Sequence, residues 1–184
     1  EMQRSLVGSE MCIRDRNIVY KVIDSAECPL IMDADALNII ADDISLLKKC
    51  KSTVIITPHI GEMERLCHIP KDDILRDIAG FAARFAAENN VICVLKDAAT
   101  VVASPDGGLY INTSGCAAMS KGGMGDVLTG VISGMLACRL EPFSAAAMGV
   151  YIHGLAGCAA SEGKSLHSVK AGDLFEYIGT VMCK

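Results

Sequence analysis

The amino-acid sequence predicts an α/β fold in which helices pack on both faces of a mostly parallel sheet. From residue 17 onward, short apolar runs bounded by turn-forming residues alternate with longer stretches of helical periodicity, the pattern of consecutive βα units. Hydrophobic residues make up 51% of the 184 residues and aromatic residues only 4%, so we expect a core of small and aliphatic side chains. This length suits a single domain.

Residues 1–16 differ from the rest of the chain. They show neither helical nor strand periodicity, and they resemble a translated sequencing artefact more than a protein segment. We therefore interpret residues 1–16 as non-native and expect the domain to begin at residue 17.

Two βα pairs open the domain. The apolar run over residues 29–33 predicts a buried strand that ends in Asp33, and residues 35–41 predict the helix that follows it. A second strand is predicted over residues 53–57, where Pro58 marks its end, and a short helix comes next.

The middle of the chain predicts a helix and a hairpin. Apolar residues recur at three- and four-residue steps over residues 72–88, as an amphipathic helix requires. Strands are predicted over residues 91–95, 100–103 and 109–112, and the turn sequence over residues 105–108 makes the last two an antiparallel hairpin. Three further helices are predicted over residues 126–138, 142–161 and 171–182.

The composition excludes several classes of function. The formal net charge is -5 and the pI is about 5.3, without the basic cluster that nucleic-acid binding requires. No apolar stretch has the uninterrupted length of a membrane helix, and no signal peptide is apparent. The nine cysteines form no CxxC pair and are odd in number, which favours free thiols in a reducing compartment. We expect a cytoplasmic protein.

A glycine-rich loop carries the strongest indication of chemistry. Gly122, Gly123 and Gly125 directly precede Asp126 at the predicted start of a helix. Glycine lets the backbone approach a ligand closely, and the first amides of a helix attract anions, so the loop predicts an anion hole. An aspartate there suits a general base that accepts the proton of an attacking hydroxyl. The alternative is that Asp126 only caps the helix.

The sequence of this loop, GGMGDVLTG from Gly122 to Gly130, resembles the signature of the ribokinase-like superfamily. It is most similar to that of the ADP/ATP-dependent NAD(P)H-hydrate dehydratase family. Four further segments follow the order of this family, at residues 33–38, 57–63, 95–102 and 151–157. Two positions depart from the family pattern: Cys116 stands where asparagine is usual, and Asp97 stands where glycine usually follows the lysine.

This resemblance implies a ribokinase-like three-layer α/β/α sandwich that is incomplete at its N-terminus. Residues 17–184 would then form the C-terminal part of one catalytic domain, because the family domain begins with additional βα units. The same resemblance is compatible with a homo-oligomer and, in the native protein, with a fusion to an N-terminal epimerase domain.

The resemblance also implies roles for individual residues. Asp126 is expected to be the catalytic base and a substrate contact, with Gly123 and Gly125 in the anion hole. His59 and Asn38 are expected to contact the substrate, and no residue is assigned to a metal. The nucleotide site is expected to comprise Lys96, Asp97, Ala98, Ala99, Thr100, Gly122 and Gly125.

Structural explanations compete with some of these roles. His59 could be a turn residue after a proline, although the end of a buried strand is where an open α/β sheet binds ligands. Lys96 could extend from its strand end to solvent, and Asn38 could satisfy backbone groups in the first helical turn. His153 lies in an apolar helix beside two glycines and is interpreted as a hydrogen-bonded packing residue.

The implied activity is the dehydration of the S epimer of hydrated NADH or NADPH, a lyase reaction of nicotinamide nucleotide repair. ADP or ATP phosphorylates the ring hydroxyl, elimination restores the dinucleotide, and Mg²⁺ accompanies the nucleotide. One alternative is a ribokinase-like kinase of a vitamin-precursor alcohol, hydroxyethylthiazole or hydroxymethylpyrimidine. Another is a catalytically impaired nucleotide-binding fragment, which Asp97 and Cys116 suggest.

Overall fold

The computed structural model describes residues 15–183. Residues 1–14, most of the segment interpreted above as non-native, lie outside the described residues. Residues 15 and 16 begin a helix that extends over residues 15–25. The position of the domain boundary therefore stays a prediction.

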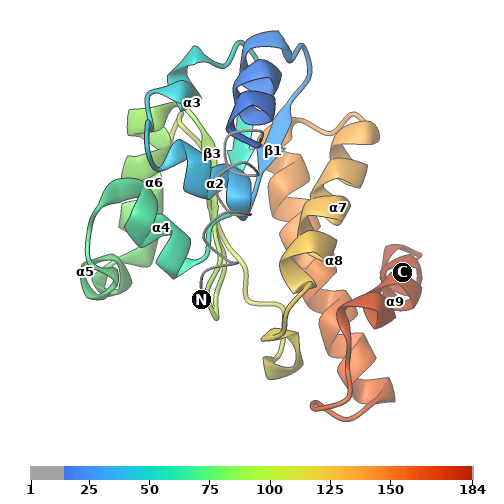
Figure 1. Cartoon of the computed structure of the whole chain (residues 1–184). Coiled ribbons are helices and arrows are strands. Elements are labelled where there is room, and N and C mark those ends of the chain that lie inside the picture. Colours follow the sequence, from blue (N-terminus) through green and yellow to red (C-terminus); the bar gives the residue numbers. More distant parts are fainter. Residues whose placement is uncertain (1–14, 184) are drawn as a thin grey trace, which may run out of the picture.

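A five-stranded sheet with the order β1-β2-β3-β4-β5 lies at the centre of the fold (Figure 1). Its strands are β1 (Leu30–Met32), β2 (Val54–Ile56), β3 (Ile92–Leu95), β4 (Val101–Ala103) and β5 (Leu109–Ile111). The first three strands are parallel, whereas β4 and β5 are each antiparallel to the strand before them. All five predicted strands and the antiparallel hairpin are thus confirmed.

Helices cover both faces of the sheet, which confirms the predicted three-layer α/β/α sandwich (Figure 1). One layer contains α2 (Asp35–Ile40), α3 (Leu46–Lys49), α4 (Ile60–Cys67), α5 (Lys71–Arg76) and α6 (Ile78–Asn89). The opposite layer contains α7 (Met124–Ala137) and α8 (Pro142–Gly163), and α9 (Leu174–Met182) packs on α8. Two short 3₁₀ helices, Ala117–Met119 and Ala171–Asp173, lie between these elements.

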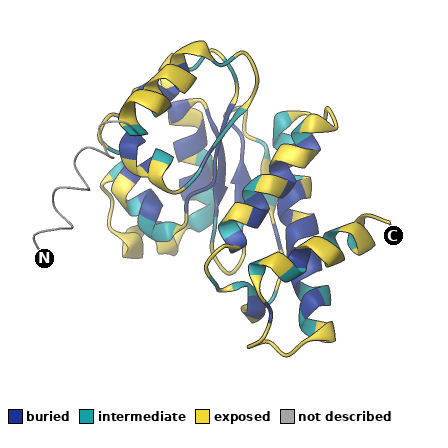
Figure 2. Cartoon of the chain, turned by 45° about the vertical axis from the view of Figure 1, so that its right-hand side comes forward, coloured by how far each residue is buried: buried dark blue, intermediate teal, exposed yellow. Residues whose placement is uncertain are grey.

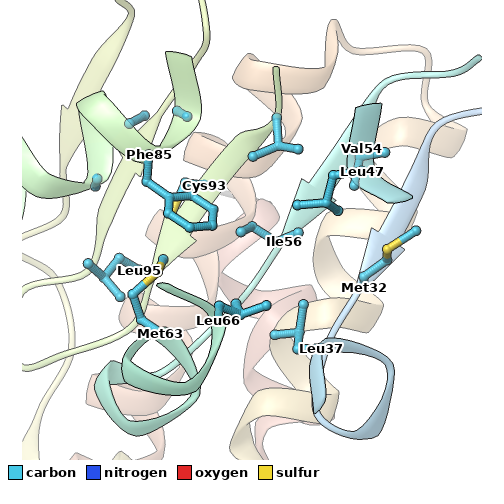
Figure 3. Close-up of a cluster of buried hydrophobic side chains, with 14 of the residues drawn as sticks. Met32, Leu37, Leu47, Val54, Ile56, Met63, Leu66, Phe85, Cys93 and Leu95 are labelled. Atoms are coloured by element: carbon cyan, nitrogen blue, oxygen red, sulfur yellow. The ribbon is translucent and has the colours of Figure 1, made fainter. Parts of the chain in front are cut away.

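The sheet separates two hydrophobic clusters because successive strand residues point to opposite faces. The cluster beneath α2 to α6 includes Met32, Leu37, Leu47, Val54, Ile56, Met63, Leu66, Phe85, Cys93 and Leu95 (Figure 3). The cluster beneath α7 and α8 includes Ile55, Ile92, Val94, Val102, Leu128, Ile132, Ala146 and Val150. Strands β2, β3 and β4 are therefore buried on both faces, as their continuous apolar runs require, whereas Leu109 and Ile111 of the edge strand β5 are exposed.

One predicted helix is wrong in its extent. Residues 72–88 were expected to form a single helix, but the structure divides them into α5 and α6 at Asp77, whose φ of -152° and ψ of 72° are not helical. The Asp77 carboxylate accepts a hydrogen bond from the Gly80 amide at 2.9 Å and so caps α6. The apolar spacing continues across the break, which is why periodicity alone predicts one helix.

The cysteines of the described residues are free thiols, as expected. Cys93 is fully buried in β3, and burial raises the pKa of its thiol far above the ordinary value, which keeps the group protonated and unreactive.

Helix α8 is apolar because it is buried. By length and composition alone it is long enough to cross a membrane, but 56% of its most apolar stretch is buried, against α7, α9 and the sheet (Figure 2). Its contact with α7 is close: a β-carbon at Gly149 would lie only 2.6 Å from Ile132 Cγ1 and 3.2 Å from Ile132 Cα.

We expect Gly149→Ala to lower the free energy of unfolding by about 1–3 kcal/mol, because the added methyl group forces α7 and α8 apart. Gly134→Ala is the matched control, since no atom lies within 4 Å of a β-carbon at this exposed position of α7. This control should be neutral or stabilising by about 0.5–1 kcal/mol, because alanine favours helix. Urea unfolding measures both values, and equal effects would contradict the packing explanation.

Candidate active site

A cleft of about 930 Å³ lies where the parallel strands end. Asp33 and Lys96, which directly follow β1 and β3, line it together with His59, three residues after the end of β2. The loop over residues 112–126 and helix α8 complete its walls. The carboxyl ends of parallel strands are the usual ligand site of an open α/β sheet. This cleft is therefore the candidate active site.

An ion pair joins two of these strand ends. Asp33 follows β1 and Lys96 follows β3, and Lys96 Nζ lies 2.9 Å from Asp33 Oδ1. The Lys96 and Asp33 side chains are only 21% and 14% exposed, so solvent screens their attraction weakly. The hydroxyl of Thr129 in α7 donates a hydrogen bond to Asp33 Oδ2 at 3.4 Å. Asp33 thus holds the ammonium group at the cleft and connects it to α7.

His59 forms the N-cap of α4. Its Nδ1 accepts hydrogen bonds from the amides of Gly61 at 3.0 Å and Glu62 at 3.2 Å, and the Glu62 carboxylate accepts one from the His59 amide. Because Nδ1 is an acceptor, a neutral His59 ring carries its proton on Nε2. A backbone bridge with Lys96 places the two residues side by side at the cleft. His59 therefore both caps α4 and lines the cleft.

The glycine-rich loop begins at Asn112, whose side chain fixes the turn. The Asn112 amide nitrogen donates to the Ser114 carbonyl at 2.9 Å, and its Oδ1 accepts from the Ser114 hydroxyl at 2.9 Å. The Tyr110 hydroxyl donates to the same oxygen at 3.1 Å. Asn112 is buried, so these contacts hold the first residues of the loop in one conformation.

The loop then lies on α8 because α8 has glycine at the points of contact. A β-carbon at Gly154 would lie 2.1 Å from Ser114 Oγ, and one at Gly157 would lie 2.3 Å from Met119 Sδ. Neither distance is sterically possible. The segment over residues 151–157 thus supports the loop, and the thiol of Cys116 donates to the Gly157 carbonyl at 3.5 Å.

Lys121 anchors the other end of the loop. Its Nζ donates hydrogen bonds to three backbone carbonyls, those of Leu166 at 3.1 Å, His167 at 2.9 Å and Val169 at 2.7 Å. These bonds use all three ammonium hydrogens. Lys121 therefore ties the segment before α9 to the loop directly ahead of the Gly122–Gly123 turn.

The start of α7 presents free backbone amides to the cleft. Gly123 is the N-cap with a φ of 85°, a left-handed conformation that favours glycine, and its carbonyl accepts the Val127 amide at 3.2 Å. The amides of Gly125 and Asp126 come before Val127 in this first helical turn, and they have no backbone acceptor among the described residues. A β-carbon at Gly125 would lie 3.4 Å from Lys96 Nζ. Amides and ammonium thus converge, which suits an anion such as phosphate.

Asp126 lies in the first turn of α7, is exposed and lines the cleft. Its side chain does not cap the helix, because the N-cap is Gly123 and no side-chain cap bond is present there. It also makes no salt bridge within the described part of the chain. A carboxylate placed this way beside an anion site can accept a proton from a hydroxyl in the cleft.

Most predicted site residues meet in this cleft, but two do not. Asn38 lies exposed on α2, where its side-chain amide donates to Asp35 Oδ1 at 3.4 Å, and Ala99 does not line the cleft either. The predicted residues that line it are His59, Lys96, Asp97, Ala98, Thr100, Gly122, Gly123, Gly125 and Asp126.

Several cleft residues were not among the predicted site residues, including Asp33, Asn112, Lys121 and His153. Asp33 follows a buried strand, as His59 and Lys96 do, so the rule that ligands bind at strand ends could have found it. Lys121 depends on contacts with the segment before α9, and His153 reaches the cleft from α8. Local sequence patterns carry no signal for such contacts. Among the described residues, the Asn112 side chain bonds only Tyr110 and Ser114, two residues away on either side.

A mixed sheet between two helical layers, with a glycine loop and an aspartate at the start of a helix, defines a ribokinase-like protein. A solved ribokinase-like superfamily protein from Enterococcus faecalis matches with a TM-score of 0.77 at 27% identity, over 91% of this chain and 57% of that one. The NAD(P)H-hydrate dehydratase family model matches residues 11–180. The chain belongs to this family.

Individual relatives agree with this family. The bifunctional NAD(P)H-hydrate repair enzyme Nnr of Moorella thermoacetica is 39% identical over 166 residues, 90% of this chain and 31% of that protein. The ADP-dependent (S)-NAD(P)H-hydrate dehydratase of Bacillus subtilis is 37% identical over 157 residues, 85% of this chain and 55% of that protein.

A crystal structure of the ADP/ATP-dependent NAD(P)H-hydrate dehydratase from B. subtilis, co-crystallized with ATP/Mg²⁺, matches with a TM-score of 0.78 at 36% identity. The match covers 88% of this chain and 56% of that one. The chain therefore spans between 31% and 56% of the length of these dehydratases and repair enzymes.

The capping role of His59 is testable by itself. His59→Ala should lower the free energy of unfolding by about 1 kcal/mol, because two amides of α4 lose their acceptor, while His59→Asn should keep most of that stability, since asparagine is a good N-cap. Urea unfolding compares the two variants with His167→Ala, a change at an exposed histidine. Equal stability of the alanine and asparagine variants would contradict the cap.

Proposed function

We propose that the protein catalyses the ADP- or ATP-dependent dehydration of the S epimer of hydrated NADH or NADPH. The observation that carries this proposal is Asp126, an exposed carboxylate beside the free amides of α7, in one cleft with Lys96 and His59. Membership of the NAD(P)H-hydrate dehydratase family supports the choice of substrate.

The reaction needs a proton acceptor and an anion site in one place. The hydroxyl that hydration added to the nicotinamide ring attacks the terminal phosphoryl group, its proton passes to Asp126, and the bond from phosphorus to the nucleotide oxygen breaks. The amides of Gly125 and Asp126 stabilise charge on the transferred oxygens. Phosphate then leaves together with a ring proton, which restores the double bond of NADH or NADPH.

The two ligands are assigned to opposite sides of Lys96. The hydrated dinucleotide contacts His59, whose Nδ1 caps α4 and whose Nε2 lies 3.5 Å from Glu62 Oε1. The adenine nucleotide lies along Lys96 and the start of the hairpin, with Asp97, Ala98 and Thr100 in the cleft wall. Asn38 and Ala99, which do not line the cleft, take no part in this arrangement.

Mg²⁺ fits this site as a companion of the nucleotide phosphates, whose charge it neutralises when bound. The described residues contain no group of three or more histidine, cysteine or acidic side chains that could hold a metal ion. A cation that binds with the nucleotide would take most of its ligands from phosphate and water.

A kinase of a vitamin-precursor alcohol would use the same base and anion hole. The dehydratase is favoured because the family model and the relatives reported above are named for hydrated nicotinamide dinucleotides. A cytoplasmic location and a homo-oligomer belong to the same proposal. The bifunctional name of the M. thermoacetica relative supports a fusion to an epimerase domain.

Asp126→Asn should lower kcat for NADH recovery from the S epimer of hydrated NADH by about 10²- to 10⁴-fold, because an amide cannot accept the proton. The absorbance of NADH follows recovery by the full-length protein with Mg²⁺ and ADP or ATP. Calorimetry should show undiminished ATP binding by this variant, since it loses a negative charge near the phosphates.

Full turnover by Asp126→Asn would overturn its role as the base. A wild-type enzyme that binds ATP without recovering NADH would fit an impaired nucleotide-binding protein, whereas phosphorylation of hydroxyethylthiazole or hydroxymethylpyrimidine would favour the kinase.

Asp97→Asn should tighten ATP binding by about two- to fivefold at low ionic strength, because the exposed carboxylate repels the phosphates. The gain should shrink as salt rises. Asp72→Asn on α5 makes the same charge change at an exposed position that does not line the cleft and should leave the affinity unchanged. An Asp97→Asn affinity equal to that of the wild type would show that this carboxylate does not act on the nucleotide.

A further inference from the structure

Two cysteines meet where the glycine-rich loop lies on α8. Cys116 belongs to the loop, and its thiol lies 3.5 Å from the carbonyl oxygen of Gly157. This carbonyl is part of the peptide bond that joins Gly157 to Cys158, so the Cys116 thiol reaches the backbone of Cys158. The thiols of Cys116 and Cys158 also contact each other, and the Cys158 thiol contacts the backbone of Gly115. The loop and α8 therefore each present a thiol to the other.

Packing on both sides of Cys116 holds the loop close to α8. A β-carbon at Gly154 would clash with Ser114 Oγ, and one at Gly157 would clash with Met119 Sδ. Glycine at these two positions lets the loop approach the backbone of the helix. A disulfide requires two cysteines on neighbouring segments whose side chains point toward each other, and this pair meets that condition.

Both thiols are partly exposed, in contrast to the fully buried thiol of Cys93. Cys116 also lines the cleft, so a small molecule that enters the cleft meets this thiol first. Burial raises the pKa of the Cys158 thiol, which suits a group that reacts second, once the neighbouring sulfur has been activated. The pair thus has the order of reactivity that disulfide formation needs.

We propose that Cys116 and Cys158 form a reversible disulfide when the protein meets an oxidant of the low-molecular-weight disulfide class. In a reducing compartment such disulfides are transient and serve as redox sensors. Cys116 stands where the family usually has asparagine, so this thiol chemistry is not part of the family pattern.

The oxidant is a small disulfide such as oxidised glutathione. The Cys116 thiol loses its proton to solvent, and the thiolate attacks one glutathione sulfur, which breaks the glutathione S–S bond and releases the first glutathione thiolate. The Cys158 thiolate, formed in the same way, then attacks the Cys116 sulfur and releases the second. Two protein thiols are oxidised to one disulfide, one glutathione disulfide is reduced to two thiols, and the two protons end on glutathione.

The disulfide alters the cleft because it shortens the contact between the loop and α8. An S–S bond is about 2.05 Å long, far shorter than a contact between two free thiols, so it pulls residue 116 toward the helix. The same loop leads to the free amides at the start of α7. Oxidation is therefore expected to weaken ADP binding. This consequence rests on the nucleotide site of the proposed function, whereas the disulfide itself does not.

Peptide mapping tests the disulfide directly. Trypsin cuts after lysine and arginine, which places Cys116 and Cys158 in two separate peptides, residues 97–121 and 140–164, that contain no other cysteine. The full-length protein is treated with oxidised glutathione, and its remaining thiols are alkylated. Mass spectrometry should then find these two peptides linked, and dithiothreitol should separate them.

Calorimetry with ADP and Mg²⁺ tests the effect on binding. The oxidised wild type should bind ADP about tenfold more weakly than the reduced protein, and dithiothreitol should restore the affinity. Cys116→Ser should show the same ADP affinity before and after oxidation. Cys158→Ser should stop at the mixed disulfide, seen as a glutathione adduct on the peptide 97–121. Cys138→Ser removes an exposed cysteine that does not line the cleft and should oxidise like the wild type.

Peptides that remain unlinked in oxidised glutathione would overturn the proposal, and so would a linkage of Cys116 to any other cysteine. Linked peptides together with an unchanged ADP affinity would overturn the effect on the cleft. A reduced wild type that fails to bind ADP would contradict the proposed function but not the disulfide, because the mapping needs no nucleotide.

Discussion

The arrangement of the cleft depends on the carboxylate of Asp33. It accepts hydrogen bonds from Lys96 Nζ at 2.9 Å and from the Thr129 hydroxyl at 3.4 Å, so one side chain joins the ends of β1 and β3 to α7. The Asp33 side chain is only 14% exposed. Replacing it would leave the Lys96 ammonium partly buried without a counter-charge, which destabilises the folded protein. The bond from Thr129 to Asp33 adds to the packing of Leu128 and Ile132 on the strands, which holds α7 beside the sheet.

The loop before α7 is ordered by contacts made before any ligand arrives. The Asn112 side chain fixes its first turn, and the Lys121 ammonium holds its other end to three carbonyls. The backbone amides at the start of α7 are therefore oriented in advance, which reduces the entropy lost when an anion binds to them. The helices behind the sheet thus shape the cleft at its edge.

The strands were predictable because each is an apolar run that ends at a polar or turn-forming residue. The loop and Asp126 were predictable because glycine and acid lie adjacent in sequence. The break at Asp77 was not, since it depends on backbone angles that leave the apolar spacing intact. Asn38 was wrongly expected in the cleft, because it belongs to a segment that resembles the family sequence. Its side chain does not line the cleft and instead bonds Asp35 on the same helix.

The contact between Met119 and Gly157 has a consequence for sequence variation. The sulfur of Met119 occupies the space in which any side chain at position 157 would begin, since a β-carbon there would lie 2.3 Å from Sδ. A larger residue at position 157 therefore requires the Met119 side chain to move or to be replaced by a smaller one. The two positions are thus sterically coupled, although 37 residues of sequence lie between them.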